Sequence, residues 1–233
     1  MPLSSPGWDT KAVVFDFGGT IDTDGVHWSE KFWELYERYE IRVAKKEFER
    51  AFVRADEELM GEDCSKDTFY GILHKQLLKQ FAILKLEQSE IILDVMMNSC
   101  YQDALGTVQK AKLTLRELAP HYSLGVVSNF YGNLDNVCRD FGLEELFDAV
   151  IDSTVVGVRK PDPEIFSMAL RRLNVDPRHS FVVGDSYDRD MVPSKKLGCT
   201  TVWLRGKSWT QPSSTDAADY TIHRFEEVKE ILL

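Results

Sequence analysis

The chain has 233 residues, of which 43% are hydrophobic and 28% are charged, and this composition excludes a mainly disordered protein. Its formal net charge of −10 argues against a protein that coats nucleic acid or an anionic membrane. The length allows one large domain, or one domain with a sizeable insertion. The sequence shows no signal peptide, no run of ~20 apolar residues and no zinc-type cysteine spacing. We therefore expect a cytoplasmic protein that binds neither nucleic acid nor membrane.

The first predicted element is a strand at residues 12–15 (AVVF), a short apolar run that ends in Asp16. From about residue 27 to residue 104 no convincing strand follows, and apolar residues recur at helical spacing in four stripes. The stripes are Phe32, Leu35, Tyr36 and Tyr39; Phe48, Phe52, Ala55 and Leu59; Phe69, Leu73 and Leu77; and Ile92, Val95, Met96 and Ser99. These stripes are typical of a helical bundle core. They predict an all-helical cap subdomain at residues 23–104, inserted after the first strand.

After this insert, the sequence alternates between helical patterns and short apolar runs. The helical patterns occupy residues 108–118, 166–173 and 191–197. The strand-like runs occupy residues 124–127, 149–151, 181–183, 200–204 and 220–222. Such alternation predicts right-handed βαβ crossovers and a parallel sheet buried on both faces. The predicted fold class is therefore α/β. Residues 1–22 and 105–233 are predicted to form a Rossmann-like, three-layer α/β/α core.

Polar residues with complementary chemistry follow the predicted strands. Asp16, Ser128-Asn129 and Asp185 stand at carboxyl ends of strands, where open α/β sheets bind ligands, and Lys160 lies in a nearby loop. Carboxylates suit Mg²⁺, which prefers hard oxygen ligands. An ammonium and a hydroxyl suit the oxygens of a phosphoryl group. From these residues alone, the leading chemistry is metal-assisted attack on a phosphate monoester, with Asp16 as metal ligand or nucleophile.

Four segments carry a family resemblance. They are VVFDFGGTID (13–22), VVSNF (126–130), GVRKPDPEIF (157–166) and VVGDSYDRDM (182–191). In this order they resemble the four motifs of the haloacid dehalogenase superfamily, and the pair K-P-D-P and V-G-D-S-x-x-x-D is the most specific part. The helical insert sits where that family places a helical cap. The resemblance implies a Rossmannoid sheet with a mobile cap that closes over the site.

The resemblance also implies a role for each matching residue. Asp16 would be the nucleophile that forms a covalent aspartyl intermediate. Ser128 and Lys160 would hold the transferring group, and Asn129 would complete the substrate site at its edge. Asp190 would orient a metal-bound water or complete the metal shell. The implied ligands of Mg²⁺ are Asp16, the carbonyl of Gly18, Asp185 and Asp190.

One position departs from the family pattern and leaves three hypotheses open. Gly18 stands where phosphatases of the family usually carry a second aspartate as general acid and base, a role worth ~10²–10⁴-fold in rate. The first hypothesis is a phosphatase in which another group supplies that proton transfer, with Asp22, Asp24 and His27 as the candidates.

The second hypothesis is a phosphonatase-like or dehalogenase-like hydrolase, neither of which needs the second aspartate. Phosphonatases instead use a cap lysine that forms an imine with the substrate. The candidates are Lys31, Lys45, Lys46 and Lys66. The third hypothesis is a catalytically impaired relative that binds ligand. The leading hypothesis remains a Mg²⁺-dependent hydrolase, a monomer or homodimer, that acts on a small phosphorylated metabolite.

Overall fold

A computed structural model describes residues 12–87, 90–209 and 212–233. Its core is a parallel sheet of six strands in the order β3-β2-β1-β4-β5-β6. The strands are β1 (Ala12–Phe15), β2 (Ser123–Ser128), β3 (Ala149–Asp152), β4 (Ser180–Gly184), β5 (Thr200–Leu204) and β6 (Tyr220–Ile222). All the strands predicted from the apolar runs are present, and the α/β fold class is confirmed.

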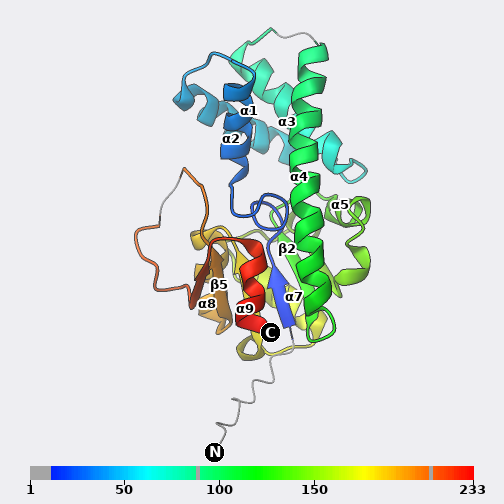
Figure 1. Ribbon diagram of the computed structural model, residues 1–233, viewed down its shortest axis with the longest axis vertical. Coiled ribbons are helices and arrows are strands. Elements are labelled where there is room, and N and C mark those ends of the chain that lie inside the picture. The colour runs from blue at the N-terminus through cyan, green and yellow to red at the C-terminus, as the bar shows by residue number, and fades with distance from the viewer. Residues whose placement is uncertain (1–11, 88–89, 210–211) are drawn as a thin grey trace, which may run out of the picture.

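Helices cover both faces of this sheet (Figure 1). Val13 and Phe15 of β1 pack in one cluster with α4 (Glu90–Leu118), α5 (Leu134–Asp140) and α9 (Val228–Leu232). Val14 belongs to a second cluster with α7 (Glu164–Leu173) and the end of α8 (Val192–Leu197). Because successive side chains of a strand point to opposite faces, both faces of β1 are buried. This double burial explains why its sequence is continuously apolar rather than alternating.

The order of the strands creates a crevice at one end of the sheet. The chain runs from β1 to β2 to β3 on one side and returns through α6 (Ser153–Val156) and α7 to β4, on the other side of β1. Such a reversal leaves a ligand-binding crevice outside the carboxyl ends of the two central strands. Asp16 directly follows β1 and Asp185 directly follows β4. The topology therefore brings two residues that are 169 positions apart in the chain to one place.

A helical subdomain lies beyond this end of the sheet (Figure 1). It consists of α1 (Trp28–Arg38), α2 (Lys45–Met60), α3 (Phe69–Leu84) and the first half of α4, and is called the helical cap below. The apolar stripes of α1, α2 and α3 meet in its interior. The Tyr36 ring lies 4.9 Å from that of Phe48 and 5.6 Å from that of Phe81. Aromatic contacts of this kind add to the stability that burial supplies.

None of the helices among the described residues combines the length and the hydropathy that a membrane span requires.

The sequence prediction was wrong about the fourth stripe. It separates a cap helix around residues 92–99 from a core helix at residues 108–118, but α4 runs through both without a break (Figure 1). The buried face also differs, because Val95 is 49% exposed whereas Leu93 and Met97 are buried. Since α4 packs on the cap helices and then on the sheet, two different neighbours set its buried face. The proposed boundary between residues 104 and 105 falls inside this helix.

Gly106 lies inside α4, close to that boundary, where a glycine weakens a helix. A Cβ built on Gly106 meets no atom within 4 Å, so an alanine methyl group fits. Gly106→Ala is therefore expected to raise the free energy of unfolding by about 0.5–1 kcal/mol, the difference in helix propensity. Urea denaturation measures this change. A lower stability than wild type would show that α4 needs a bend at this residue.

Candidate functional site

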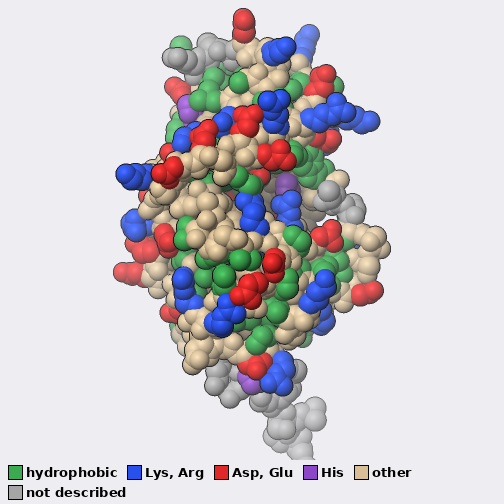
Figure 2. Space-filling model, turned by 180° about the vertical axis from the view of Figure 1, so that it is seen from behind, with side chains coloured by type: hydrophobic (Ala, Val, Ile, Leu, Met, Phe, Trp, Pro, Cys, Tyr) green, Lys and Arg blue, Asp and Glu red, His purple; other side chains and the backbone are tan. Residues whose placement is uncertain are grey.

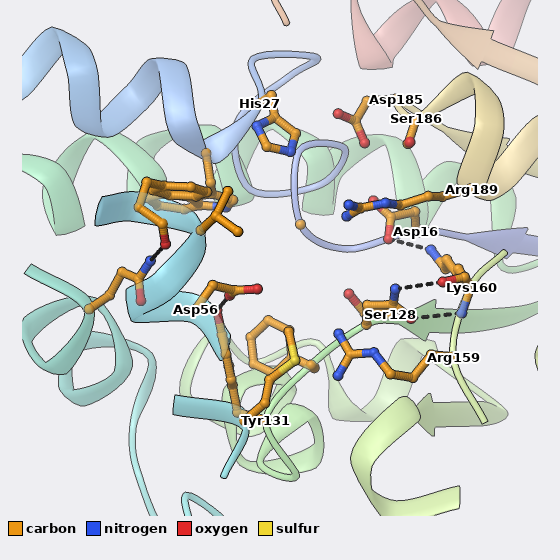
Figure 3. A pocket seen from close by; sticks show the side chains of 18 of the residues that line it. Asp16, His27, Asp56, Ser128, Tyr131, Arg159, Lys160, Asp185, Ser186 and Arg189 are labelled. Atoms are coloured by element: carbon orange, nitrogen blue, oxygen red, sulfur yellow. Dashed lines mark hydrogen bonds and ion pairs between the residues drawn. The ribbon is translucent and has the colours of Figure 1, made fainter. Parts of the chain in front are cut away.

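The carboxylate of Asp16 lies in a buried cluster of charges at the end of β1 (Figure 3). Lys160 Nζ lies 2.5 Å from Asp16 Oδ1 and 2.7 Å from Asp190 Oδ1. Burial lowers the pKa of the Lys160 ammonium, but the two carboxylates outweigh burial and raise that pKa above its usual value. Lys160 is therefore a fixed positive charge beside Asp16.

Thr20 connects the two carboxylates that follow β1 and β4. Its hydroxyl donates to Asp16 Oδ2 at 3.0 Å and accepts from the backbone N–H of Asp185 at 3.0 Å. Gly19 permits the close approach, because a Cβ at this position would lie 2.5 Å from Asp185 Oδ2 and its φ is +98°. The sequence analysis missed this linking role of Thr20, since a hydroxyl in a tight turn is more often a local turn residue.

Three carboxylates at this end of the sheet form a donor set for a cation. Oxygens of Asp16, Asp185 and Asp190 lie within 4.8 Å of one another. Burial, together with Asp16 and Asp190, raises the pKa of Asp185 well above its usual value. Burial also raises the pKa of Asp190 to about 6, although Lys160 opposes the shift. Three carboxylates this close together carry more negative charge than Lys160 alone balances. An all-oxygen donor set of this kind fits Mg²⁺. The other predicted ligand, Gly18, lines the same cavity.

Ser128 and Asn129 follow β2 but differ in what their side chains do. Ser128 is buried and lines the cavity that contains Asp16. The Asn129 side chain accepts from the Lys160 backbone N–H at 2.9 Å and donates to the Lys160 carbonyl at 3.1 Å. Asn129, which the sequence predicts to be a substrate-binding residue, also lines the cavity. Its amide group is occupied by Lys160, so Asn129 positions the lysine.

Two of the three groups that might replace the missing aspartate lie outside the cavity. Asp22 is fully buried and accepts from the Gly19 backbone N–H at 2.7 Å and from Trp28 Nε1 at 2.8 Å. Burial raises the pKa of Asp22 to about 7. Asp24 accepts from the backbone N–H of Phe225 at 2.6 Å. Neither aspartate lines the cavity in this arrangement of the cap, so neither stands ready to transfer a proton there.

His27 is the third group, and it does line the cavity (Figure 3). Its Nδ1 accepts from the backbone N–H of Ser29 at 3.2 Å and thereby caps α1. Burial, and then the positive charge of Arg189, lower the pKa of His27 to about 4. The ring is therefore neutral near pH 7, with its proton on Nε2. In this state Nε2 can donate a hydrogen bond to a ligand, but the ring is a weak base.

The low pKa of His27 predicts a measurable pH dependence of stability. The unfolded chain, with a histidine pKa near ~6.5, binds the proton more tightly than the folded chain. Stability should therefore fall as the pH drops from about 6.5 towards 4. His27→Asn keeps a capping acceptor but does not titrate. Between pH 7 and pH 5, wild type should lose about 2 kcal/mol more of its unfolding free energy than this variant. Urea denaturation at both pH values tests this, and equal losses would contradict the assignment.

A cavity of about 390 Å³ lies between the helical cap and the core. Figure 2 shows Lys or Arg side chains beside a His side chain at the groove between these two parts. Asp16, Ser128 and Lys160 line it from the core. The opposite wall comes from the cap helices and is mostly apolar, apart from Asp56 and Gln76. It includes Phe32, Phe52, Met60, Phe69, Ile72 and Leu73.

The helical cap contacts the core directly beside this cavity. The Tyr131 hydroxyl hydrogen-bonds Asp56 of α2 (Figure 3), and Asn133 Nδ2 donates to the Asp67 carbonyl at 2.8 Å. These contacts hold the cap over Asp16. Among the described lining residues the only lysine is Lys160. The candidate cap lysines lie elsewhere on the cap, and two of them form ion pairs, Lys31 with Glu34 and Lys45 with Glu30.

A comparison with models of protein families identifies the family of this chain. A model described as a haloacid dehalogenase-like hydrolase matches residues 10–198. The chain belongs to the haloacid dehalogenase-like hydrolases. The resemblance drawn from the four sequence segments is therefore confirmed.

Relatives within this hydrolase family carry different names. The chain is 35% identical over 111 residues to haloacid dehalogenase-like hydrolase domain-containing protein 3 of Bos taurus, which is 47% of this chain and 44% of that protein. It is 34% identical over 133 residues to the glyceraldehyde 3-phosphate phosphatase of Pyrococcus furiosus, or 55% of each chain. The chain thus spans about half the length of the curated relatives that it matches.

The fold is also similar to that of solved haloacid dehalogenase-like structures. A crystal structure of a dehalogenase with an intermediate complex aligns with a TM-score of 0.65 at 20% identity, covering 96% of this chain and 97% of that chain. At this level of identity the similarity concerns the fold alone. It does not choose between phosphatase and dehalogenase chemistry, because function resides in the site rather than in the fold.

Several site residues of this haloacid dehalogenase-like hydrolase escaped the sequence analysis. Arg159 and Arg189 line the cavity, and both lie within the quoted segments, directly before Lys160 and Asp190. Their position in these motifs was the available signal. Asp56 carried no such signal, because it lies on α2, far from every motif. Only the packing of the helical cap on the core brings it to the site.

Proposed function

We propose that this hydrolase is a Mg²⁺-dependent phosphatase that acts on a small phosphorylated metabolite through an aspartyl-phosphate intermediate. The observation that carries the proposal is the arrangement around Asp16. Its carboxylate lines the cavity between the helical cap and the core, 2.5 Å from the Lys160 ammonium and beside the carboxylates of Asp185 and Asp190. Several relatives are named as glyceraldehyde 3-phosphate phosphatases, which supports a phosphate ester as substrate.

The chain's own residues divide the reaction between them. Asp16 attacks the phosphorus, and the bond to the leaving oxygen breaks as water protonates that oxygen. A second water then cleaves the aspartyl-phosphate, which releases inorganic phosphate and restores the Asp16 carboxylate. Lys160 holds the non-bridging oxygens and neutralises charge in the transition state, and Ser128 donates a hydrogen bond to them. Mg²⁺ held by Asp16, Gly18, Asp185 and Asp190 would supply further positive charge to the same oxygens. Asn129 fixes the Lys160 backbone, and the helical cap excludes bulk water.

Both alternative chemistries fit this site less well. A phosphonatase needs a cap lysine at the reacting carbon, and Lys160 is the only lysine among the described cavity residues. A dehalogenase does not need the carboxylate cluster, yet Asp185 and Asp190 are buried with Asp16 where a cation fits. The three carboxylates and the buried Lys160 therefore favour phosphoryl transfer. The same four residues argue against the third hypothesis, a catalytically impaired relative that only binds ligand.

A phosphate-release screen tests the proposal. The full chain is assayed with p-nitrophenyl phosphate, sugar phosphates, nucleotides and phosphonates, with Mg²⁺ and after exhaustive chelation. We expect release from monoesters that requires Mg²⁺ and returns when Mg²⁺ is restored. Release from phosphonates alone would favour the imine chemistry, and full activity after chelation would overturn the metal requirement. Asp16→Asn, assayed in the same screen, is the inactive control.

A further inference from the structure

Two arginines line the cavity on the core side. Arg159 precedes Lys160, and Arg189 lies in the helical turn Tyr187–Met191 after β4. Figure 3 shows both guanidinium groups directed into the cavity, on either side of Asp16 and Ser128. Within the part of the chain that the structure describes, neither forms a hydrogen bond or an ion pair. By contrast, Arg171 and Arg178 on the outer surface pair with Glu164 and Asp176.

The charges near Asp16 leave these two arginines available to a substrate. Lys160 is already bound by the carboxylates of Asp16 and Asp190. The remaining carboxylate charge of the cluster is what a divalent cation would balance. Asp56 on the opposite wall is influenced by the charges of both arginines but forms no ion pair with either of them. It accepts a hydrogen bond from Tyr131, and burial raises its pKa.

Both guanidinium groups reach into the part of the cavity that lies between Asp16 and the helical cap (Figure 3). The charge of Arg189 acts on His27 and Asp56, and the charge of Arg159 acts on Asp56 and Tyr131. These partners line the part of the cavity that faces the cap, whereas Lys160 and Ser128 stand beside Asp16. The guanidinium groups therefore face the space that the leaving group of a phosphate ester would fill.

Guanidinium groups bind carboxylates and phosphates through paired, charge-assisted hydrogen bonds, and they do so best where water is partly excluded. We propose that the substrate is a phosphate monoester whose leaving group carries a second anionic group, which Arg159 and Arg189 bind together. The second group is a carboxylate or another phosphate. This inference rests on the proposed phosphatase function and narrows its substrate class. The apolar wall of the cap would then cover the remainder of the leaving group.

Matched substrate pairs test this inference. One pair is 3-phosphoglycerate and glycerol 3-phosphate, and the other is fructose 1,6-bisphosphate and fructose 6-phosphate. Within at least one pair, wild type should show a kcat/KM at least about tenfold higher for the member with the second anion. The pair that responds distinguishes a carboxylate from a phosphate. Arg159→Gln and Arg189→Gln should each lower that preference about 10-fold or more, mainly through KM. The control Arg171→Gln should leave it unchanged.

Two outcomes would overturn the inference. The first is a wild type without preference in either pair, and the second is a set of arginine variants that lower kcat/KM equally for both members of a pair. The second result would place the guanidinium groups on the transferring phosphoryl group.

Binding to the Asp16→Asn variant, measured by calorimetry, tests recognition without turnover. Here too the member with the second anionic group should bind about tenfold more tightly. Absence of hydrolysis of any monoester would overturn the proposed function, while this binding preference would still decide the inference.

Discussion

Asp16→Asn should lower kcat for phosphate release by more than about 10³-fold, because an amide cannot attack phosphorus as a carboxylate does. Asparagine has nearly the same shape, so the hydrogen bond from Thr20 can persist. Lys160 also keeps Asp190 as a charged partner. The folded structure should therefore survive. Phosphate release with a monoester substrate and circular dichroism of the same preparation measure the two effects.

A matched variant separates loss of the nucleophile from a general effect of removing a carboxylate. Asp140 is exposed at the end of α5 and lies outside the cavity, so Asp140→Asn should retain the wild-type rate. If Asp16→Asn were to keep a tenth of the wild-type kcat, Asp16 would not be the nucleophile. Unfolding of the variant would leave the rate uninterpretable, and Asp16→Ser would then replace it in the same assay.

Gly18→Asp should increase the steady-state rate by about 10²-fold or more, provided that hydrolysis of the aspartyl-phosphate limits turnover. The enzyme has no carboxylate two residues after Asp16, and Asp22, Asp24 and His27 are engaged in other contacts. An added carboxylate would activate water for the second step. A Cβ on Gly18 meets only Trp28, at 3.8 Å, which is ordinary contact. Its φ is also outside the left-handed region.

The control for this gain is Gly18→Asn, which adds similar volume without an ionisable group. Steady-state assays with p-nitrophenyl phosphate compare both variants with wild type. Only the aspartate should accelerate turnover. Equal rates in the two variants would contradict the account, because they would show that another group already transfers the proton or that attack by Asp16 is the slow step.

The sequence predicts the sheet and the floor of the site well, and the reasons are local. Each strand is a continuous apolar run, and Asp16 and Asp185 follow directly from strand ends, so their meeting follows from parallel topology. The same reasoning places Ser128 beside them. These predictions depend on periodicity and on fold rules that hold for any open parallel sheet.

Other features depend on contacts between distant segments and could not be predicted. The continuity of α4 depends on its packing against both the cap helices and the sheet. The apolar pattern of its first half alone therefore predicts a separate cap helix. The part played by Asn129 depends on where the loop that holds Lys160 lies. The direction of Arg189 depends on the turn after β4, since an arginine in a loop is usually solvated. In each case the side chain's environment comes from tertiary packing rather than from neighbouring sequence.

The central claim is that Asp16 carries the phosphoryl group during turnover, and rapid-quench trapping tests it most directly. Wild type is mixed with p-nitrophenyl phosphate and Mg²⁺, quenched in acid within the first turnover, digested and examined by mass spectrometry. We predict a phosphoryl group on the peptide that contains Asp16, a burst of up to one p-nitrophenol per site, and neither signal in Asp16→Asn. Steady turnover by wild type without a phosphorylated Asp16 peptide, together with retained activity in Asp16→Asn, would contradict the account.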